Sequence, residues 1–145
     1  MDVSNLILIG QVSSIDPDTG KARVAFDDLD EMTSTWLPVT QQGTAGMQTH
    51  SPLTVGEHVL CIFLPSGMEN GFIIGGYYTE SNRPEYKGAG IYSTSYSDGT
   101  VIQYDLNESK LTVTAVGDIT INAGGAINIS SDTSIRLSAP VVDIN

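Results

Sequence analysis

Short alternations of apolar and polar residues run through the chain, and helical periodicity is nearly absent. Runs rich in Val, Ile, Thr, Tyr and Phe are separated by turn residues, which is typical of an all-β protein. Five such runs occupy the first part of the chain, at residues 5–15, 21–27, 35–39, 57–64 and 71–78. The pattern therefore predicts five short strands before residue 79.

The first part favours a small closed barrel. Five short, strongly bent strands suit an OB-fold, which we predict over residues 1–78. Gly10 interrupts the first run where a strand coiling around a barrel needs a bulge or a close approach of backbones. Cys61 lies in an apolar run and should be a small buried hydrophobe. The expected barrel core consists of Val24, Phe26, Trp36, Val59, Cys61 and Phe63.

Residues 79–98 are expected to be a linker that leads into the first strand of a hairpin. The stretch 79–90 is rich in polar residues, proline and glycine. Asp98-Gly99 is the strongest short-range signal for a hairpin turn. A different repeating pattern follows over residues 99–145.

Apolar pairs recur about every eight positions from residue 111 onward, with polar residues at the alternate positions. Because side chains alternate across a strand, this pattern predicts a stack of short strands with one apolar and one polar face. The last pair arrives one residue early, after Ala139-Pro140. The residues of the apolar face are Leu111, Val113, Ile119, Ile121, Ile127, Ile129, Ile135, Leu137, Val142 and Ile144.

Three arrangements could bury this apolar face. A solenoid within one chain would have too few coils, since such folds need about three repeats. Packing against the barrel is possible, but a narrow, evenly spaced stripe suits a thin object better. Association of three chains encloses the stripe without a cavity, so we favour a homotrimer whose chains form the walls of a β-prism. Ten buried aliphatic residues contribute on the order of 15–30 kcal/mol per chain before chain ordering is subtracted.

The charge balance excludes several function classes. The formal net charge is −11, with 6 Lys and Arg against 17 Asp and Glu. Binding of nucleic acid or of anionic lipid by charge is therefore disfavoured. The N-terminus lacks a basic segment ahead of a cleavage site, so we expect a protein made in the cytoplasm without an export signal of its own.

The chemistry-bearing side chains do not form a catalytic or metal-binding pattern. Asp27, Asp28, Asp30 and Glu31 lack the glycine-punctuated spacing of a calcium loop and are expected to be a solvated turn. His50 and His58 have no nucleophile at a defensible spacing. We therefore expect no catalytic residues, no metal and no cofactor. Arg136 is expected on the outward, solvated face of the repeat.

Several stretches of the chain, in this order, resemble a known family. They are IGQVSSIDPDTGKARVAF, WLPV, SPLTVGEHVLCIFLPSG, GFIIGGYY, SYSDGTVIQYD and LTVTAVGDITI. Their order, spacing and junction with the eight-residue repeat resemble the baseplate assembly protein V family, the central spike of contractile phage tails. More distantly, the chain is similar to spikes of type VI secretion and of phage-tail-like bacteriocins. The resemblance covers roughly residues 6–145.

The resemblance implies an N-terminal OB-fold, a C-terminal triple-stranded β-helix and a homotrimer at the centre of a virion tail baseplate. The implied partners are a hub or tail tube protein on the N-terminal side and, transiently, the target cell envelope, which the spike pierces when the sheath contracts. Longer family members end in a tip with a histidine-x-histidine iron site. Neither His50 nor His58 matches that motif, so no metal is carried over, and we expect a separate tip protein or a truncated chain.

Other functions remain open on the sequence alone. A trimeric tail fibre module that binds a receptor or glycan through the barrel loops is the main alternative to a structural spike. A polysaccharide-cleaving β-helix enzyme would need paired carboxylates, whereas the repeat offers only isolated Asp118, Asp132 and Asp143. An OB-type nucleic-acid binder is the least favoured because of the charge.

Overall fold

The structure is a computed structural model that describes residues 5–145, so the first four residues of the predicted OB-fold range lie outside it. The chain divides between Glu85 and Tyr86 into two compact units. Apart from one 3-10 turn, η1 (Asp27–Leu29), the regular elements of the described residues are strands. The predicted all-β class is therefore confirmed.

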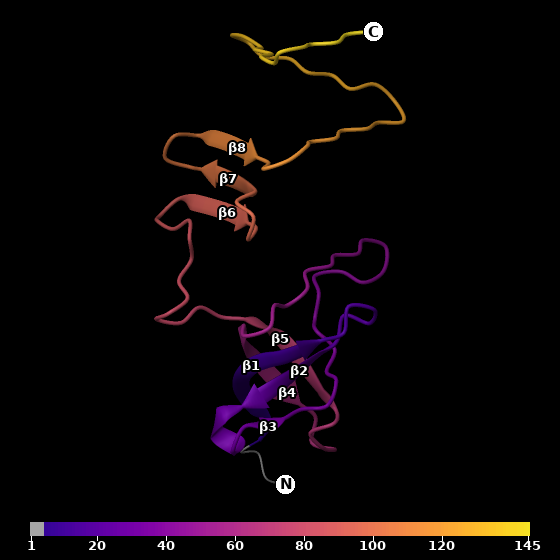
Figure 1. Cartoon of the computed structure of the whole chain (residues 1–145), viewed down its shortest axis with the longest axis vertical. Coiled ribbons are helices and arrows are strands. Elements are labelled where there is room, and N and C mark those ends of the chain that lie inside the picture. Colours follow the sequence, from indigo (N-terminus) through magenta and orange to yellow (C-terminus); the bar gives the residue numbers. More distant parts are fainter. Residues whose placement is uncertain (1–4) are drawn as a thin grey trace. The chain divides into compact units, whose positions relative to one another are not determined.

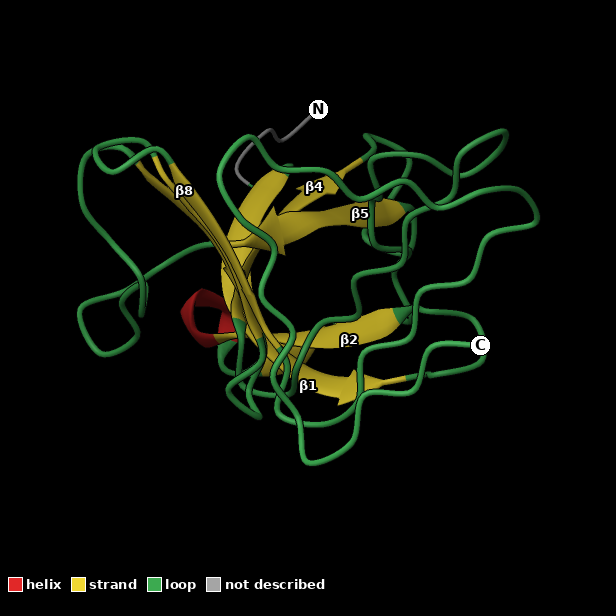
Figure 2. Cartoon of the chain, turned by 90° about the horizontal axis from the view of Figure 1, so that it is seen from above, coloured by secondary structure: helices red, strands yellow, loops and turns green. Residues whose placement is uncertain are grey.

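The first unit contains one antiparallel sheet of five strands. They are β1 (Ile7–Ile15), β2 (Ala22–Phe26), β3 (Met32–Thr33), β4 (His58–Phe63) and β5 (Gly71–Gly76), in the order β3-β2-β1-β4-β5. Figure 1 shows the order of these elements along the chain, and Figure 2 shows how strongly β1, β2, β4 and β5 curve. Four of the five predicted strands are confirmed with small shifts of their ends.

The predicted strand at 35–39 is replaced by two isolated bridges that join both sides of the sheet. Leu37 and Ala22 exchange two backbone hydrogen bonds of 2.9 and 3.0 Å. On the other side, Ile73 N–H donates to the Pro38 carbonyl at 2.9 Å, and Thr40 N–H donates to the Ile73 carbonyl at 3.0 Å. Pro38 has no N–H of its own, so a continuous ladder cannot form here. The segment nevertheless links β2 to β5.

The core of the first unit lies on the concave side of this sheet. Phe26 and Phe63 meet edge to face with ring centroids 5.9 Å apart. Of the predicted core residues, five are buried: Val24, Phe26, Val59, Cys61 and Phe63. Burial raises the pKa of the Cys61 thiol to about 11, so the side chain stays protonated and packs as a small apolar group. The other members of the buried cluster are Val12, Ala22, Leu37 and Ile73.

Trp36 is the exception among the predicted core residues. Its side chain is 38% exposed, whereas the neighbouring Leu37 is fully buried. Successive side chains of an extended segment point to opposite sides, and the bridge to Ala22 turns Leu37 inward. The Trp36 ring instead packs under the Arg23 guanidinium, whose carbon lies 4.7 Å from the ring centroid, a cation–π contact. Leu37 therefore takes the core position that was expected for Trp36.

Gly10 is a point of close approach between β1 and β2, as predicted. A Cβ at this position would lie 2.4 Å from the Ala25 carbonyl oxygen and 2.7 Å from Val24 Cγ1. The pairing of β1 with β2 also changes register between Val12 and Ser14, which marks a bulge in the same strand. A residue without a side chain thus lets β1 bend across β2.

Substitution of Gly10 by Ala should destabilise the first unit by roughly 1–3 kcal/mol, because the added methyl group has to displace backbone atoms. Gly46→Ala is the matched control, since a Cβ there meets no heavy atom within 4 Å. Urea unfolding followed by Trp36 fluorescence measures both variants. Equal unfolding midpoints for Gly10→Ala and Gly46→Ala would contradict the close approach.

Candidate functional site

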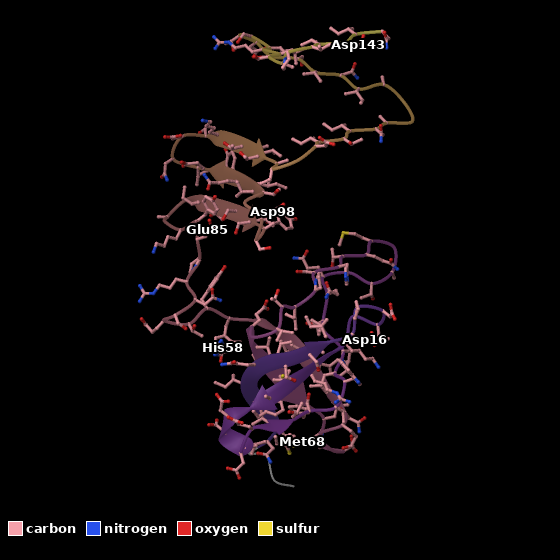
Figure 3. All side chains as sticks on the ribbon, in the orientation of Figure 1. Asp16, His58, Met68, Glu85, Asp98 and Asp143 are labelled. Carbon is pink, nitrogen blue, oxygen red and sulfur yellow. The ribbon has the colours of Figure 1, made fainter. Side chains whose placement is uncertain are left out.

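The second unit begins with a three-stranded antiparallel sheet. Its strands are β6 (Ile91–Ser95), β7 (Val101–Asp105) and β8 (Lys110–Thr114), in that order across the sheet. The hairpin between β6 and β7 contains Asp98-Gly99, with Gly99 in the left-handed region at φ 98°. Asp98, labelled in Figure 3, accepts a 2.9 Å hydrogen bond at Oδ1 from the Thr100 N–H. The predicted hairpin is therefore confirmed.

One face of this sheet is apolar and uncovered within the chain. Cross-strand pairing aligns Tyr92 with Tyr104 and Tyr104 with Leu111, and it aligns Ile102 with Val113. The exposed fraction of these five side chains ranges from 38% to 66%. Leu111 and Val113 were predicted from the repeat, whereas the three residues before them were not. The apolar stripe therefore starts earlier than the eight-residue pattern indicates.

Residues 115–145 continue from β8 without forming a strand. Figure 1 draws this segment as a thin trace beyond the β8 arrow. Among the described residues, no backbone–backbone hydrogen bond within the chain involves this segment. Every residue from 116 to 145 is exposed. The segment therefore has no backbone partner in the same chain, and its internal hydrogen bonds are local ones to hydroxyl groups, such as those of Thr133 N–H and Ser134 N–H to Ser131 Oγ.

All ten residues of the predicted apolar face are exposed in the single chain. Their exposed fractions run from 49% for Val142 to 81% for Ile144. An isolated extended segment is not stable by itself, because water solvates its exposed backbone as well as it does in an unfolded chain and its apolar side chains stay in contact with water. Burial of the ten residues between chains stays a prediction. The geometry does show that their own chain does not bury them.

The chemistry-bearing residues are dispersed. Asp30 and Glu31 have left-handed backbones at φ 52° and 58° and follow η1 in an exposed turn. His58 Nε2 lies 2.9 Å from Gln11 Nε2, and its ring stacks edge-on against Tyr77, while His50 is exposed in a loop. Among residues 5–145, no group of three or more His, Cys, Asp or Glu side chains is placed to hold a metal ion.

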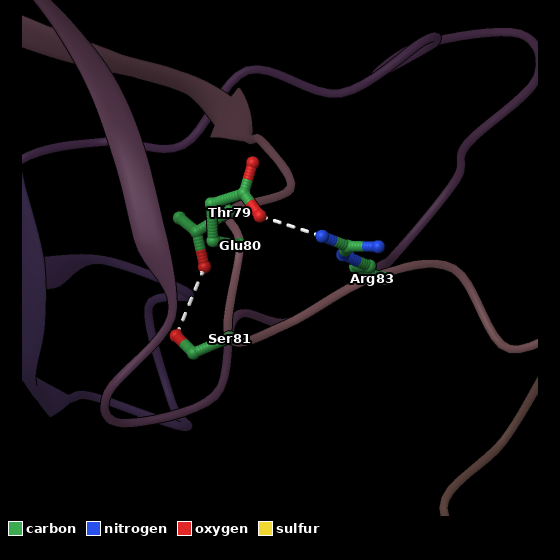
Figure 4. A network of polar contacts seen from close by, with 4 residues as sticks. All are labelled: Thr79, Glu80, Ser81 and Arg83. Atoms are coloured by element: carbon green, nitrogen blue, oxygen red, sulfur yellow. Dashed lines mark hydrogen bonds and ion pairs between the residues drawn. The ribbon is translucent and has the colours of Figure 1, made fainter.

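The segment between the sheets carries a small polar network. Figure 4 shows the Arg83 guanidinium donating to the Glu80 carboxylate, and the Thr79 hydroxyl beside that of Ser81. The ion pair measures 2.5 Å, and the two hydroxyl oxygens lie 3.3 Å apart. The two charged side chains are 61% and 95% exposed, so the ion pair adds little stability. This network holds a local turn and has no features of a reactive site.

The hollows of the first unit also lack clustered reactive groups. One hollow of about 290 Å³ is lined by Glu57, Gly76, Tyr77, Tyr78 and Asn82. It contains one carboxylate, whereas hydrolysis of a glycosidic bond by the usual route requires two. In the described part of the chain, no helix has the length and apolar character needed to cross a membrane. The outstanding surface is therefore the apolar stripe of the second unit.

Comparison with known proteins places this stripe in context. The chain is 25% identical over 145 residues to the spike protein of Escherichia phage P2, and the match covers 95% of this chain and 67% of the relative. The chain is thus similar in sequence to a phage spike protein. No protein family model matches it. The likeness to the P2 spike extends through both units, which agrees with the resemblance inferred from the sequence stretches.

The Asp98 turn should make the stability of the second unit depend on pH. Hydrogen bonds from the backbone and hydroxyl of Thr100 hold the pKa of Asp98 below its ordinary value of 3.8. The carboxylate therefore contributes stability above about pH 4, and this stability is lost as the pH falls through and below that value. Asp98→Asn should flatten the acid side of the stability profile, because asparagine does not titrate there.

Asp118→Asn is the matched control, since it removes one negative charge from the same unit outside the turn. Thermal unfolding followed by circular dichroism between about pH 2 and 6 covers the relevant window. Equal flattening by the two variants would mean that net charge, and not the turn, sets the acid sensitivity.

Proposed function

We propose that this protein is the central spike of a contractile-tail baseplate, and that it works mechanically. One observation carries the proposal: residues 115–145 present a regular, exposed apolar stripe and, among the described residues, make no backbone–backbone hydrogen bond with their own chain. Similarity to the P2 spike protein supports a role in a phage tail and a place in the virion. Both point to a segment whose structure is completed by other chains of the same spike.

Three copies of the chain complete each other in this proposal. Each chain supplies one wall of a triple-stranded β-helix, so that the stripes meet at a threefold axis and backbone groups pair between chains. The sheet β6–β8 adds Tyr92, Ile102 and Tyr104 to the same stripe by its cross-strand register. The polar positions, such as Thr120 and Asn128, then face water. The result is a rod with few free strand edges.

The barrel forms the N-terminal part of the spike. Closure of the sheet by residues 37–40, antiparallel to β2 and parallel to β5, supports an OB-fold. We propose that this domain joins the hub or tail tube protein, while the opposite end of the rod leads toward the target envelope. Sheath contraction drives the spike forward, and the envelope is breached by force without covalent chemistry.

Stiffness is the property that such a mechanism requires. Backbone hydrogen bonds between interlocked chains break cooperatively, because no chain can leave the rod without losing the partners of all its strands. Ten aliphatic residues per chain contribute on the order of 15–30 kcal/mol of gross burial to this cohesion. The inward aliphatic residues are thus the functional residues of the spike.

Ile127→Asp should abolish the trimer. Three carboxylates would meet near one axis, at a cost of several kcal/mol for each unpaired buried charge. Asn128→Asp is the matched control, because it adds the same charge one residue along, on the polar face. Native mass spectrometry and light scattering of the full chain measure the oligomer. The proposal fails if Ile127→Asp remains a stable trimer or if the unmodified chain is a monomer.

A further inference from the structure

The convex side of the first sheet carries an apolar surface that the barrel core does not use. Cross-strand pairing aligns Ile7 with Ile62 and Ile62 with Phe72, and it aligns Ile9 with Leu60. The exposed fractions are 65% for Ile7, 40% for Ile62 and 41% for Phe72. We call this surface the outer apolar face; its residues are Ile7, Ile9, Leu60, Ile62, Phe72 and Ile74.

The outer apolar face is unusual for an antiparallel sheet. The inward side chains of the same strands, such as Val59, Cys61 and Ile73, already fill the barrel core. Antiparallel sheets that cover one core normally place polar residues on the other side. A contiguous apolar surface on a water-facing side marks a contact with another molecule.

One end of the face is bounded by polar and aromatic groups. Gln11 and His58 pair beside Ile9 and Leu60, and the Tyr77 ring packs against the His58 ring with centroids 5.9 Å apart. Beside them lies a shallow hollow of about 420 Å³ between Ile9, Leu60, Ile74 and Tyr77. Figure 3 labels His58 at this boundary. The outer apolar face therefore ends at these polar and aromatic groups, and beside them it contains a recess that an apolar side chain can enter.

The other end of the face is acidic. Strands β1 and β2 are antiparallel, and Ala25 near the end of β2 pairs with Gln11 in the middle of β1. The η1 turn with Asp27 and Asp28 comes directly after β2 and therefore lies beside the first half of β1. The pair Phe63–Gly71 places the turn that contains Glu69 at the same end as Ile62 and Phe72. These carboxylates belong to exposed segments.

The cations of the first unit lie elsewhere along its strands. Lys21 and Arg23 belong to the hairpin between β1 and β2, at the end marked by the pair Ile15–Ala22. Arg23 stacks on Trp36, and Arg83 pairs with Glu80. The acidic end of the outer apolar face is therefore not balanced by a basic side chain from the described strands of its own unit.

We infer that the outer apolar face docks another tail protein, whose matching surface is apolar and rimmed by Lys and Arg. A face-to-face pair of two copies is a poor occupant, because it would bring one acidic rim against another and like charges across an interface are costly. The inference rests on the proposed function for the kind of partner. It adds which surface of the barrel is used and what chemistry that partner carries.

The test uses the full chain and two purified probes, the hub protein and the tail tube protein of the same particle. Biolayer interferometry should show that one of them binds, and that Phe72→Asp weakens this binding at least about tenfold. Val55→Asp is the matched control, because Val55 is an apolar side chain that is 59% exposed in the loop before β4 and is not one of the six residues of the face. It should change the dissociation constant less than about threefold.

Charge provides the second arm of the test. Raising NaCl from about 0.1 M to about 1 M should weaken binding of the unmodified chain, and the double variant Asp27→Asn, Asp28→Asn should reduce this salt dependence. Ile62→Thr gives a milder apolar loss and replaces Phe72→Asp if the latter does not fold by circular dichroism. The expected weakening by Ile62→Thr is smaller but in the same direction.

Three outcomes overturn the inference: neither probe binds, Val55→Asp weakens binding as much as Phe72→Asp, or Phe72→Asp splits the oligomer seen by native mass spectrometry. The last outcome would assign the face to contacts between copies. Failure of the proposed function is separate, since it appears as a monomeric unmodified chain. A trimer that binds neither probe leaves the spike assembly intact and rejects only the docking surface.

Discussion

Backbone hydrogen bonding is the constraint on which the second unit depends. Residues 115–145 are rich in Ile, Thr, Ser, Asn and Gly, which are poor helix formers, so a helix is not available to satisfy their amide and carbonyl groups. An extended segment pairs its backbone regularly only with other strands, and no described strand of its own chain pairs with residues 115–145. Apolar side chains on the same segment add a second unmet need. The described part of the chain meets neither need in full.

The strands of both units need partners for their backbone hydrogen bonds, and the two units differ in whether their own chain supplies them. The first unit closes its sheet within one chain, because residues 37–40 pair with β2 on one side and β5 on the other. Its core is accordingly complete, with Val24, Val59 and Ile73 fully buried. The second unit leaves its pairing open after β8. The chain therefore combines one unit that completes its own sheet with a second unit whose apolar stripe stays exposed.

Sequence patterns located most strands but not the details of pairing. Apolar alternation and turn residues fixed the approximate limits of β1, β2, β4 and β5, and the crowding at Gly10 followed from its place in a coiling strand. Trp36 was misplaced because hydrophobicity alone does not say which of two neighbouring apolar residues, Trp36 or Leu37, turns inward. That choice depends on a bridge to Ala22, fifteen positions earlier, which no local pattern encodes.

The start of the stripe was missed for a related reason. A two-residue Asp98-Gly99 loop would pair Ser97 with Thr100, whereas the observed register pairs Ser95 with Val101. The difference shifts the pairing by one residue and thereby decides that Tyr104 lies opposite Tyr92. The loop residues between these strands, including the left-handed Gly99, set this register, and a dipeptide signal does not determine it.

Residues 37–40, which close the barrel, are also a part of it that is held by few backbone hydrogen bonds between strands. Only two backbone hydrogen bonds join residues 37–40 to β2 and two to β5, while β1 shares longer ladders with β2 and β4, and β4 shares one with β5. Local opening of a protein begins where few bonds must break together, so amide hydrogens around Leu37 and Ile73 are placed to exchange with solvent before those of β1 and β4. We therefore expect the barrel to open locally at residues 37–40 first, which leaves an open sheet, and its central strands β1 and β4 to separate later.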